Sequence, residues 1–417
     1  MIEFAAPKRC RVAAWTAAVL LLATAAQAGD LPSPWVELAP DNVLSLRALI
    51  PSDAACPRAT AADETVSMQP RPAGDANFPV TLCEARLPAT SRSIAVDGAP
   101  LPTLPAAIRR IVVIGDTGCR LEGRAIQDCN DPAAWPFPAL ARLAAARKPD
   151  LVIHVGDYYY RESACPAGRA GCAGSPYGDD WAAWQADFFA PAAPLLAAAP
   201  WVTVRGNHEL CRRGGKGWFR LLDPHAEFAG CADRTDPYWL HLGGLDLAVF
   251  DSAGADDFTA APDKVAPYAA QLASLLASAP AHSWMVTHRP VWALAQGKLV
   301  GLVVNATEQA AIRGHVPPEL DLVLSGHLHD FTSYQFGPDR PAQLLVGDSG
   351  DTMLDLAQTD LAGVVIDGMP VQSGLALKRF GYFVMEAAAD GWNGTLYGTD
   401  DGVLAQCRLQ GRALACH

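Results

Sequence analysis

Residues 111–118 read IVVIGDTG, in which four β-branched residues lead into a glycine, Asp116 and a short turn. Continuous Val, Ile and Leu runs are typical of strands that are buried on both faces. Four later segments repeat this order of an apolar run followed by polar residues, and they read LVIHVGDYYY (151–160), WVTVRGNHE (201–209), WMVTH (284–288) and LVLSGHLH (322–329). We therefore predict that all five polar groups lie at the ends of strands.

Apolar runs alternate with helical stretches from residue 109 onward, which predicts an α/β layered domain. The strand candidates are 110–115, 150–156, 201–205, 238–241, 246–251, 283–287, 320–325 and 342–347. The helix candidates are 137–148, 178–198, 267–279 and 306–313. Ligands of open α/β sheets gather at the carboxyl ends of the strands, so we expect the five polar groups to converge there.

The segment before this region has a different pattern. Residues 29–105 contain short runs of alternating apolar and polar residues between turn signals, which indicates a small β-rich domain. The run PLPTLP at 100–105 is interpreted as a linker to the main domain at 106–417. Residues 380–417 return to short strands with glycines at turns.

The N-terminus has the three parts of a secretory signal peptide. Lys8, Arg9 and Arg11 form a basic start, residues 12–25 are an apolar stretch too short to span a membrane, and AQA at 26–28 is a cleavage motif. Cys10 precedes the apolar stretch, so a lipoprotein anchor is not expected. We expect cleavage after Ala28 and a soluble, secreted or periplasmic protein without a membrane anchor.

The chain is acidic. Removing residues 1–28 removes three basic residues and one acidic residue, so the formal net charge falls from −12 to −14. An acidic surface repels nucleic-acid polymers and anionic membranes, and neither is expected as a partner. An anionic substrate would have to be attracted by local positive charge.

Ten of the eleven cysteines remain after cleavage, and an even number in an exported chain predicts disulfides. The simplest pairing is sequential: Cys56–Cys83, Cys119–Cys129, Cys165–Cys172, Cys211–Cys231 and Cys407–Cys416. An alternative is that Cys119, which follows the Asp116 turn, is a thiolate metal ligand.

Together the five polar groups offer two Asp carboxylates, at least one phenol, one amide and four imidazoles. Oxygen and nitrogen donors suit hard or borderline metals rather than soft ones. We interpret the set as one dinuclear metal site. Basic residues that follow these segments have two interpretations, as substrate-phosphate contacts or as solvated loop charges: Arg161, Arg212, Arg213, Lys216 and Arg289.

The order D-x-G, G-D-x-x-Y, G-N-H-E, strand-end His and G-H-x-H resembles that of the calcineurin-like metallophosphoesterases. More narrowly it resembles the purple acid phosphatase branch, on two residues. Gly118 stands where many other members have a histidine, and Tyr160 stands where the purple enzymes place a metal-bound tyrosinate. Met285 replaces the usual valine three residues before His288. The resemblance spans roughly residues 109–350 and implies a layered αββα sandwich.

The resemblance also implies roles for individual residues. Asp116, Tyr160 and His329 would hold Fe(III), and Asn207, His288 and His327 would hold a divalent Fe, Zn or Mn ion. Asp157 would bridge the two ions, and no organic cofactor is expected. His208, as an imidazolium beside the substrate, would stabilise the transition state or protonate the leaving group. Of the phenols at 158–160, the spacing of the family motif favours Tyr160.

The implied activity is hydrolysis of small phosphate monoesters by attack of a metal-bound hydroxide. A first alternative is a phosphodiesterase or nucleotide hydrolase on the same scaffold. A second, from another class, is an exported binding protein without catalysis. Glu209 is interpreted as a partner of the ligands or a cap, and Asp348 and Asp351 are interpreted as turn residues.

Overall fold

The computed structural model describes Met1 and residues 31–228, 230–295, 302–356 and 358–417. The predicted signal peptide at 1–28 lies outside these ranges apart from Met1. Residues Leu31–His417 form one compact unit. Within the described ranges, no helix combines the length and the apolar character that crossing a membrane requires.

The first large sheet has eleven strands. Its parallel centre consists of β9 (Arg110–Ile114), β12 (Leu151–His154), β13 (Trp201–Thr203) and β1 (Trp35–Ala39). Antiparallel strands extend it on one side with β2 (Val43–Pro51), β6 (Val80–Pro88) and β5 (Gln69–Pro70). They extend it on the other side with β25 (Gly381–Ala388), β26 (Gly391–Gly398), β27 (Val403–Gln410) and β28 (Ala413–Cys416).

The second large sheet has seven strands. Its parallel centre consists of β15 (Asp246–Phe250), β16 (Ser283–Thr287), β19 (Leu320–Ser325) and β21 (Ala342–Val346). The antiparallel strands at its edges are β14 (Tyr238–His241), β20 (Phe331–Gln335) and β24 (Ser373–Leu377). All eight predicted strands of residues 110–347 are therefore present, with ends that differ from the prediction by two residues at most.

The helices cover the outer faces of the two sheets. They are α1 (Phe137–Ala146), α2 (Trp181–Trp184), α3 (Ala190–Leu196), α4 (Gly215–Leu221), α5 (Pro262–Leu276) and α6 (Ala306–Ile312). The predicted helix at 178–198 is interrupted by a π-helical turn at Gln185–Phe189. The reason is that Pro191 has no N–H to donate to an α-helical bond, and the chain takes a wider turn before it.

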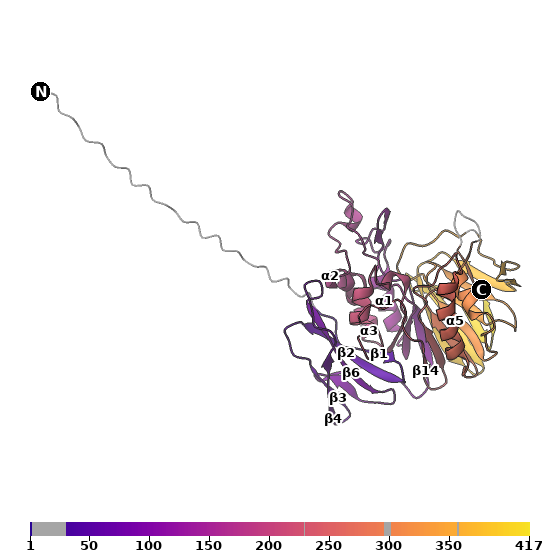
Figure 1. Ribbon diagram of the computed structural model, residues 1–417, viewed down its shortest axis with the longest axis horizontal. Helices are drawn as coiled ribbons and strands as arrows, with labels where there is room; N and C mark the ends of the chain where they lie inside the picture. The colour runs from indigo at the N-terminus through magenta and orange to yellow at the C-terminus, as the bar shows by residue number, and fades with distance from the viewer. Residues whose placement is uncertain (2–30, 229, 296–301, 357) are drawn as a thin grey trace. The chain divides into compact units, whose positions relative to one another are not determined.

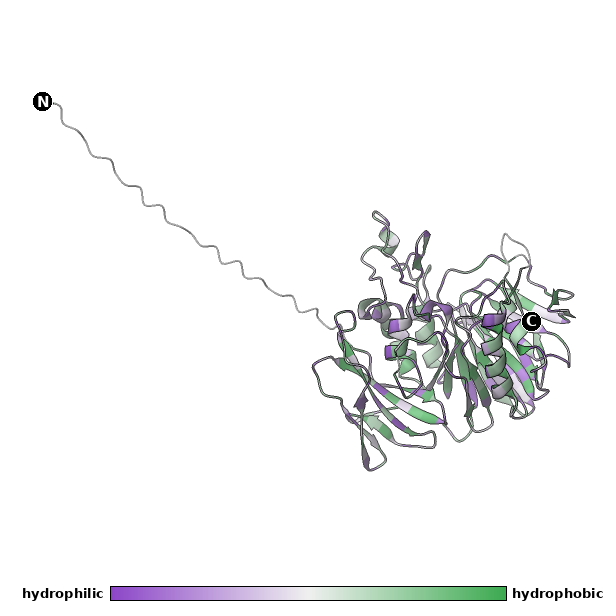
Figure 2. Cartoon of the chain, in the orientation of Figure 1, coloured by the Kyte–Doolittle hydropathy of each residue, from purple (hydrophilic) through white to green (hydrophobic). Residues whose placement is uncertain are grey.

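Alternate residues of the central strands point into different layers. Ile111 and Val113 of β9 pack between the two sheets, whereas Val112 and Ile114 pack beneath α1 and α3. Figure 1 shows the helices α1, α3 and α5 beside the strands of the sheets. On the second sheet, Leu322 faces the layer between the sheets and Val323 faces the layer under α5 and α6. Apolar residues accordingly dominate the central strands (Figure 2). The protein thus has the predicted αββα sandwich.

The N-terminal segment is β-rich, as predicted, and its longer strands continue the first sheet through the pairing of β1 with β13. A separate four-stranded sheet contains β4 (Glu64–Ser67), β3 (Arg58–Ala61), β7 (Ile94–Val96) and β8 (Ala99–Pro100). Two-stranded ribbons pair β10 (Leu121–Glu122) with β11 (Ala125–Ile126), β17 (Ala293–Ala295) with β18 (Leu302–Val304), and β22 (Val365–Ile366) with β23 (Met369–Pro370). Division of the chain into domains at residue 105 stays a prediction.

Five disulfides join the cysteines in the predicted sequential order: Cys56–Cys83, Cys119–Cys129, Cys165–Cys172, Cys211–Cys231 and Cys407–Cys416. Cys119 is therefore not a thiolate ligand. Three of the bridges close loops that follow the polar motifs. Such cross-links reduce the freedom of the unfolded loops and are typical of exported proteins.

A buried polar network joins the N-terminal strands to the loop after α4. Arg47 lies 3.0 Å from Glu37 and donates to the carbonyl oxygens of Leu221 and Asp223 at 2.9 and 2.6 Å. His225 in the same loop places Nδ1 2.7 Å from Asp223 Oδ1. Burial acts to lower the pKa of His225, but the bond to Asp223 outweighs it and raises that pKa above its ordinary value.

This raised pKa predicts how the loop responds to pH. Protonated His225 stabilises the folded state below its unfolded pKa of about 6.5, and the contribution disappears as pH rises through the folded pKa. We expect His225→Gln to lower the thermal unfolding midpoint more at about pH 5 than at about pH 9. Equal shifts at the two pH values would contradict the assignment.

Candidate metal centre

The five polar motifs follow the carboxyl ends of parallel strands, as predicted. Asp116, Asp157 and Asn207 come after β9, β12 and β13 of the first sheet. His288 and the pair His327 and His329 come after β16 and β19 of the second sheet. Because the two sheets pack face to face, their loops meet at one end of the sandwich. The structure brings all seven predicted ligands together there.

Tyr160 lies at the centre of the first group of contacts. Its hydroxyl oxygen is 3.0 Å from Asp116 Oδ1, 2.9 Å from Asp157 Oδ2 and 3.2 Å from His329 Nε2. Tyr158 and Tyr159 point elsewhere, since their hydroxyls donate to the backbone oxygens of residues 154 and 161. Of the three phenols, only Tyr160 faces the carboxylates.

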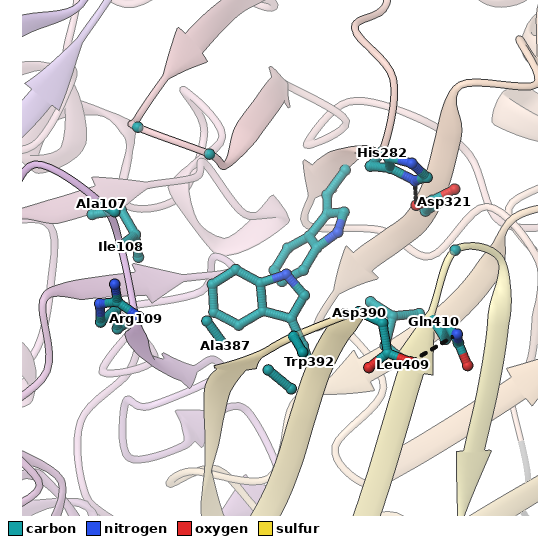
Figure 3. A pocket seen from close by; sticks show the side chains of 17 residues that line it. Ala107, Ile108, Arg109, His282, Asp321, Ala387, Asp390, Trp392, Leu409 and Gln410 are labelled. Carbon is teal, nitrogen blue, oxygen red and sulfur yellow. Dashed lines mark hydrogen bonds and ion pairs between the residues drawn. The ribbon is translucent and has the colours of Figure 1, made fainter.

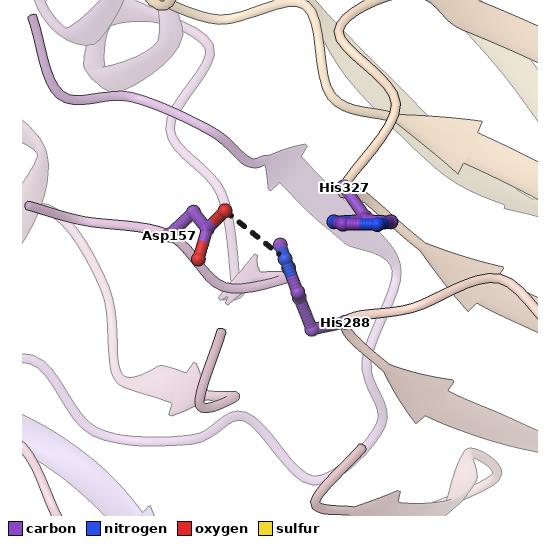
Figure 4. Close-up of side chains that lie close together, drawn as sticks. All are labelled: Asp157, His288 and His327. Atoms are coloured by element: carbon purple, nitrogen blue, oxygen red, sulfur yellow. Dashed lines mark ion pairs between the residues drawn. The ribbon is translucent and has the colours of Figure 1, made fainter. Parts of the chain in front are cut away.

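The second group of contacts surrounds His288. Its Nε2 atom is 3.1 Å from Asp157 Oδ2 and 3.1 Å from Asn207 Oδ1. Asp157, His288 and His327 can each place one ligand atom within 4.8 Å of the others. Figure 4 shows the three side chains converging from separate loops. Asp157 contacts both groups and lies between them.

Three of the predicted ligands have a strained, left-handed backbone conformation. Asp116, Asp157 and His327 have φ angles of 53°, 59° and 73°, in the left-handed region that non-glycine residues rarely occupy. Such conformations cost of order 1–3 kcal/mol each and cluster at functional sites. Gly156 has φ +102°, and a Cβ atom there would lie 2.4 Å from His288 Nδ1. A side chain at residue 156 would therefore displace His288.

Gly118 lies directly against the ring of Tyr160. A Cβ atom at residue 118 would lie 2.8 Å from Tyr160 Cδ2 and 2.7 Å from Asp187 Oδ2. Asp187 in turn accepts from the backbone N–H groups of Cys119 and Tyr160, at 2.7 and 2.6 Å. The absence of a side chain at residue 118 thus leaves room for the phenol beside Asp116.

Glu209 joins the Asp157 loop to its own loop. Its carboxylate accepts four backbone N–H bonds, from Asp157 at 3.1 Å, Tyr158 at 2.8 Å, Tyr159 at 3.2 Å and Gly206 at 2.9 Å. The residue is fully buried and is not among the contacts of the phenol or of His288. Glu209 therefore fixes the backbone that carries the ligands.

The chemistry of the donor set fits bound cations. Burial, followed by the charge of Asp157, raises the pKa of Asp116 well above the ordinary value. Burial acts in the same direction on Asp157, but His288 and His208 outweigh it and hold that pKa well below the ordinary value. Burial and the two carboxyl groups raise the pKa of Tyr160 well above its ordinary value. A metal ion would stabilise the ionised form of each group.

His208 is buried beside these donors. The centroid of its ring lies 3.8 Å from the centroid of the Tyr160 ring, and its backbone N–H donates to Asp157 Oδ1 at 2.8 Å. Nε2 is 3.9 Å from Asp157 Oδ2 and 3.1 Å from Arg213 Nη2. Nδ1 is 2.7 Å from Glu162 Oε1, without the alignment of a hydrogen bond. Burial holds the pKa of His208 well below its ordinary value, which favours a neutral ring over the expected imidazolium.

The predicted basic residues have different surroundings. Arg213 contacts His208, and Arg289 contacts His327 at 2.9 Å. Arg161 is instead buried against Asp187, and Lys216 pairs with Asp75. Arg212 is exposed. Only Arg213 and Arg289 of this set therefore directly contact the predicted ligands or His208.

Several residues around the centre were not predicted. Arg120 lies over the Tyr160 ring and pairs with Asp351, whose Oδ2 is 3.3 Å from His329 Nδ1. The sequence indicates only a turn residue at Asp351, but its carboxylate also contacts Arg120 and His329. Asp257 Oδ2 is 3.0 Å from His327 Nε2. Asp257 comes from a loop without a motif, whereas Arg120 follows the Asp116 motif and Asp351 lies in a predicted turn. No sequence signal separates these three residues from solvated charges.

A cavity of about 610 Å³ lies at the opposite end of the sandwich (Figure 3). It is lined by residues near the starts of β9, β16 and β19, including Arg109, His282 and Asp321. The rings of Trp284 and Trp392 meet there at 5.3 Å. None of the predicted ligands lines it. The metal centre is therefore identified by its donors and not by this cavity.

Comparison with known proteins finds solved structures with a similar fold. The purple acid phosphatase PPD1 from yellow lupin (Lupinus luteus) seeds has a similar structure, with a TM-score of 0.61 and 12% identity over 93% of this chain and 74% of that one. PhoD matches with a TM-score of 0.56 and 12% identity over 93% and 92% of the two chains. At this identity the matches show a shared fold. No curated protein sequence matches the chain.

The family model for calcineurin-like phosphoesterases matches residues 109–331, which include all seven predicted ligands and His208. The chain therefore belongs to the calcineurin-like phosphoesterase family and is a metal-dependent phosphoesterase.

Proposed function

We propose that the protein is an exported phosphatase that hydrolyses small phosphate monoesters at a dinuclear metal centre. The observation that carries the proposal is the convergence of seven oxygen and nitrogen donors around Asp157, with His208 beside them. Export is supported by the five disulfides and by the signal-like sequence at residues 1–28.

The donors divide into two ligand sets that share one carboxylate. Asp116, Tyr160 and His329 would hold the first ion, and Asn207, His288 and His327 would hold the second. Asp157 lies close to members of both sets and would bridge the ions. The arrangement supports the roles that the sequence motifs predict.

Tyr160 favours a strongly Lewis-acidic first ion. Its surroundings raise the pKa of the phenol above its ordinary value, so a strong cation is needed to ionise it. This requirement suits Fe(III), with a divalent Fe, Zn or Mn ion in the second position. When bound, the pair would supply Lewis acidity that activates water and neutralises charge on the phosphoryl oxygens.

Protein groups would complete the site on the His208 side. Arg213 Nη2 and the His208 ring lie 3.1 Å apart at the edge of the ligand cluster. A guanidinium is suited to hydrogen bonding with phosphate oxygens, and a neutral imidazole can donate one N–H to the phosphoryl or leaving-group oxygen. Glu122 and Glu162 pair with Arg213 at 2.8 and 2.6 Å and hold it there.

The proposal is tested by comparing two substrates with the same leaving group. For the metal-loaded protein we expect a higher kcat/KM with p-nitrophenyl phosphate than with bis(p-nitrophenyl) phosphate, because a monoester dianion makes more contacts with the metals and Arg213. A preference for the diester would instead support the phosphodiesterase alternative. A metal-loaded protein that turned over neither ester would support the non-catalytic binding protein.

A further inference from the structure

The three histidines among the predicted ligands do not use the same ring nitrogen for their supporting hydrogen bonds. Nδ1 of His288 lies 2.8 Å from the carbonyl oxygen of Val155, and Nδ1 of His329 lies 2.9 Å from that of Thr352. A carbonyl oxygen can only accept, so each Nδ1 carries the hydrogen. The Nε2 atoms are then free of hydrogen, and they face Asp157 and Tyr160.

His327 makes its supporting contacts through the other ring nitrogen, Nε2. Its Nε2 atom is 3.0 Å from Asp257 Oδ2 and 2.9 Å from Arg289 Nη1. The Nδ1 atom is the ring nitrogen that remains for ligation, on a side chain that converges with Asp157 and His288 (Figure 4). His327 would therefore bind a metal through Nδ1, whereas His288 and His329 would bind through Nε2.

Asp257 is itself fixed in place. It lies in the loop between β15 and α5, and its Oδ2 atom also contacts Arg289 Nη1. Arg289 is anchored by its backbone N–H, which donates to Ser252 Oγ at 2.8 Å. The carbonyl oxygen of Asp257 accepts from the N–H of Ala306 at 3.1 Å. These contacts hold the carboxylate against the His327 ring.

Two hydrogen-bond arrangements are compatible with these distances. Arg289 could donate to Nε2, but His327 would then carry its hydrogen on Nδ1 and would have no lone pair for a metal. Alternatively, Nε2–H donates to Asp257, and Arg289 donates to the same carboxylate. The second arrangement gives the guanidinium a charge-assisted partner and leaves Nδ1 as a donor atom.

We propose that Asp257 is a positioning residue that fixes His327 as its Nε2–H tautomer, so that Nδ1 faces the second metal. The inference rests on the metal centre proposed above. Carboxylates that accept from the second nitrogen of a ligand histidine orient the ring and raise its basicity. Asp257 is therefore expected to act on metal affinity through His327.

A double-mutant cycle on metal binding tests this role. Zn²⁺ is titrated calorimetrically into the metal-stripped full chain, and two binding steps are measured. We expect Asp257→Ala to lower the Zn²⁺ affinity of one of these steps by about 10- to 100-fold and to leave the other unchanged. In a His327→Ala background, the same substitution should cause no further loss. The matched control is Asp263→Ala, which removes an exposed carboxylate and should leave affinity unchanged.

An equal loss of affinity in both backgrounds would mean that Asp257 acts only through its charge and would overturn the proposal. Unchanged affinity in Asp257→Ala would also overturn it. The readout is metal binding and not turnover. A protein that binds two metals without hydrolysing phosphoesters would refute the proposed function and leave this cycle interpretable.

A measurement on the wild-type chain avoids dependence on variant folding. In long-range ¹H–¹⁵N spectra of the Zn²⁺-loaded protein, we expect His327 to be protonated at Nε2 and ligated at Nδ1. The rings of His288 and His329 should show the reverse pattern. A His327 ring protonated at Nδ1 would contradict the proposal.

Discussion

Replacing His208 with alanine is expected to lower kcat for a phosphate monoester by about 100- to 1,000-fold, the usual effect of removing one hydrogen-bond donor that stabilises charge in the transition state. The ring lies against Tyr160 at the edge of the ligand cluster and next to Arg213. Metal content should not change, because the link from residue 208 to Asp157 is made by the backbone N–H. Steady-state kinetics and metal analysis of the same preparation measure both effects.

The matched control for this variant is His282→Ala, since His282 is exposed at the opposite end of the sandwich. It should leave kcat and metal content unchanged. Full turnover in His208→Ala would contradict the role given to this ring. Loss of bound metal in that variant would show that the ring supports the ligands and does not act on the substrate.

Replacing Glu209 with alanine is expected to lower the free energy of unfolding by about 3–5 kcal/mol, because four buried N–H groups lose their acceptor. The four donors belong to residues 157, 158, 159 and 206, so one carboxylate joins two ligand loops. Glu209→Gln should cost less than alanine, since one acceptor oxygen remains. Denaturant unfolding of the metal-free protein measures the change without any contribution from metal binding.

Glu64→Ala is the control for this prediction, because Glu64 is exposed on β4. A surface substitution of this kind should change the free energy of unfolding by less than about 0.5 kcal/mol. A Glu209→Ala variant as stable as the control would mean that water or a shifted loop satisfies the four N–H groups.

The sequence predicts the parallel strands and the convergence of their polar ends well, for a local reason. Runs such as IVVI at 111–114 are apolar on both faces, and such runs are typical of parallel strands that are covered on both sides. The sheet therefore fixes the positions of the ligands that directly follow such strands. Three of the sequential disulfides are equally local, since their cysteines are 10, 7 and 9 residues apart.

The remaining features depend on long-range contacts. Asp257 and His327 are seventy residues apart and meet only because β15 and β19 lie in one sheet. The pairing of β1 with β13 rests on a single register contact between Glu37 and Trp201, which no pattern in residues 29–105 indicates. Gly118 and Tyr160 appear in the sequence as two separate signals, yet the phenol occupies the space that the glycine leaves.

The central claim is that the seven donors form a dinuclear metal centre. Metal analysis of the purified full chain, together with its visible spectrum, tests this claim most directly. The account predicts two metal ions per chain, at least one of them iron, and a tyrosinate charge-transfer band that disappears in Tyr160→Phe. A colourless protein that binds two zinc or manganese ions would contradict the iron–tyrosinate assignment. A protein that binds fewer than two ions after loading with iron, zinc and manganese would contradict the dinuclear centre itself.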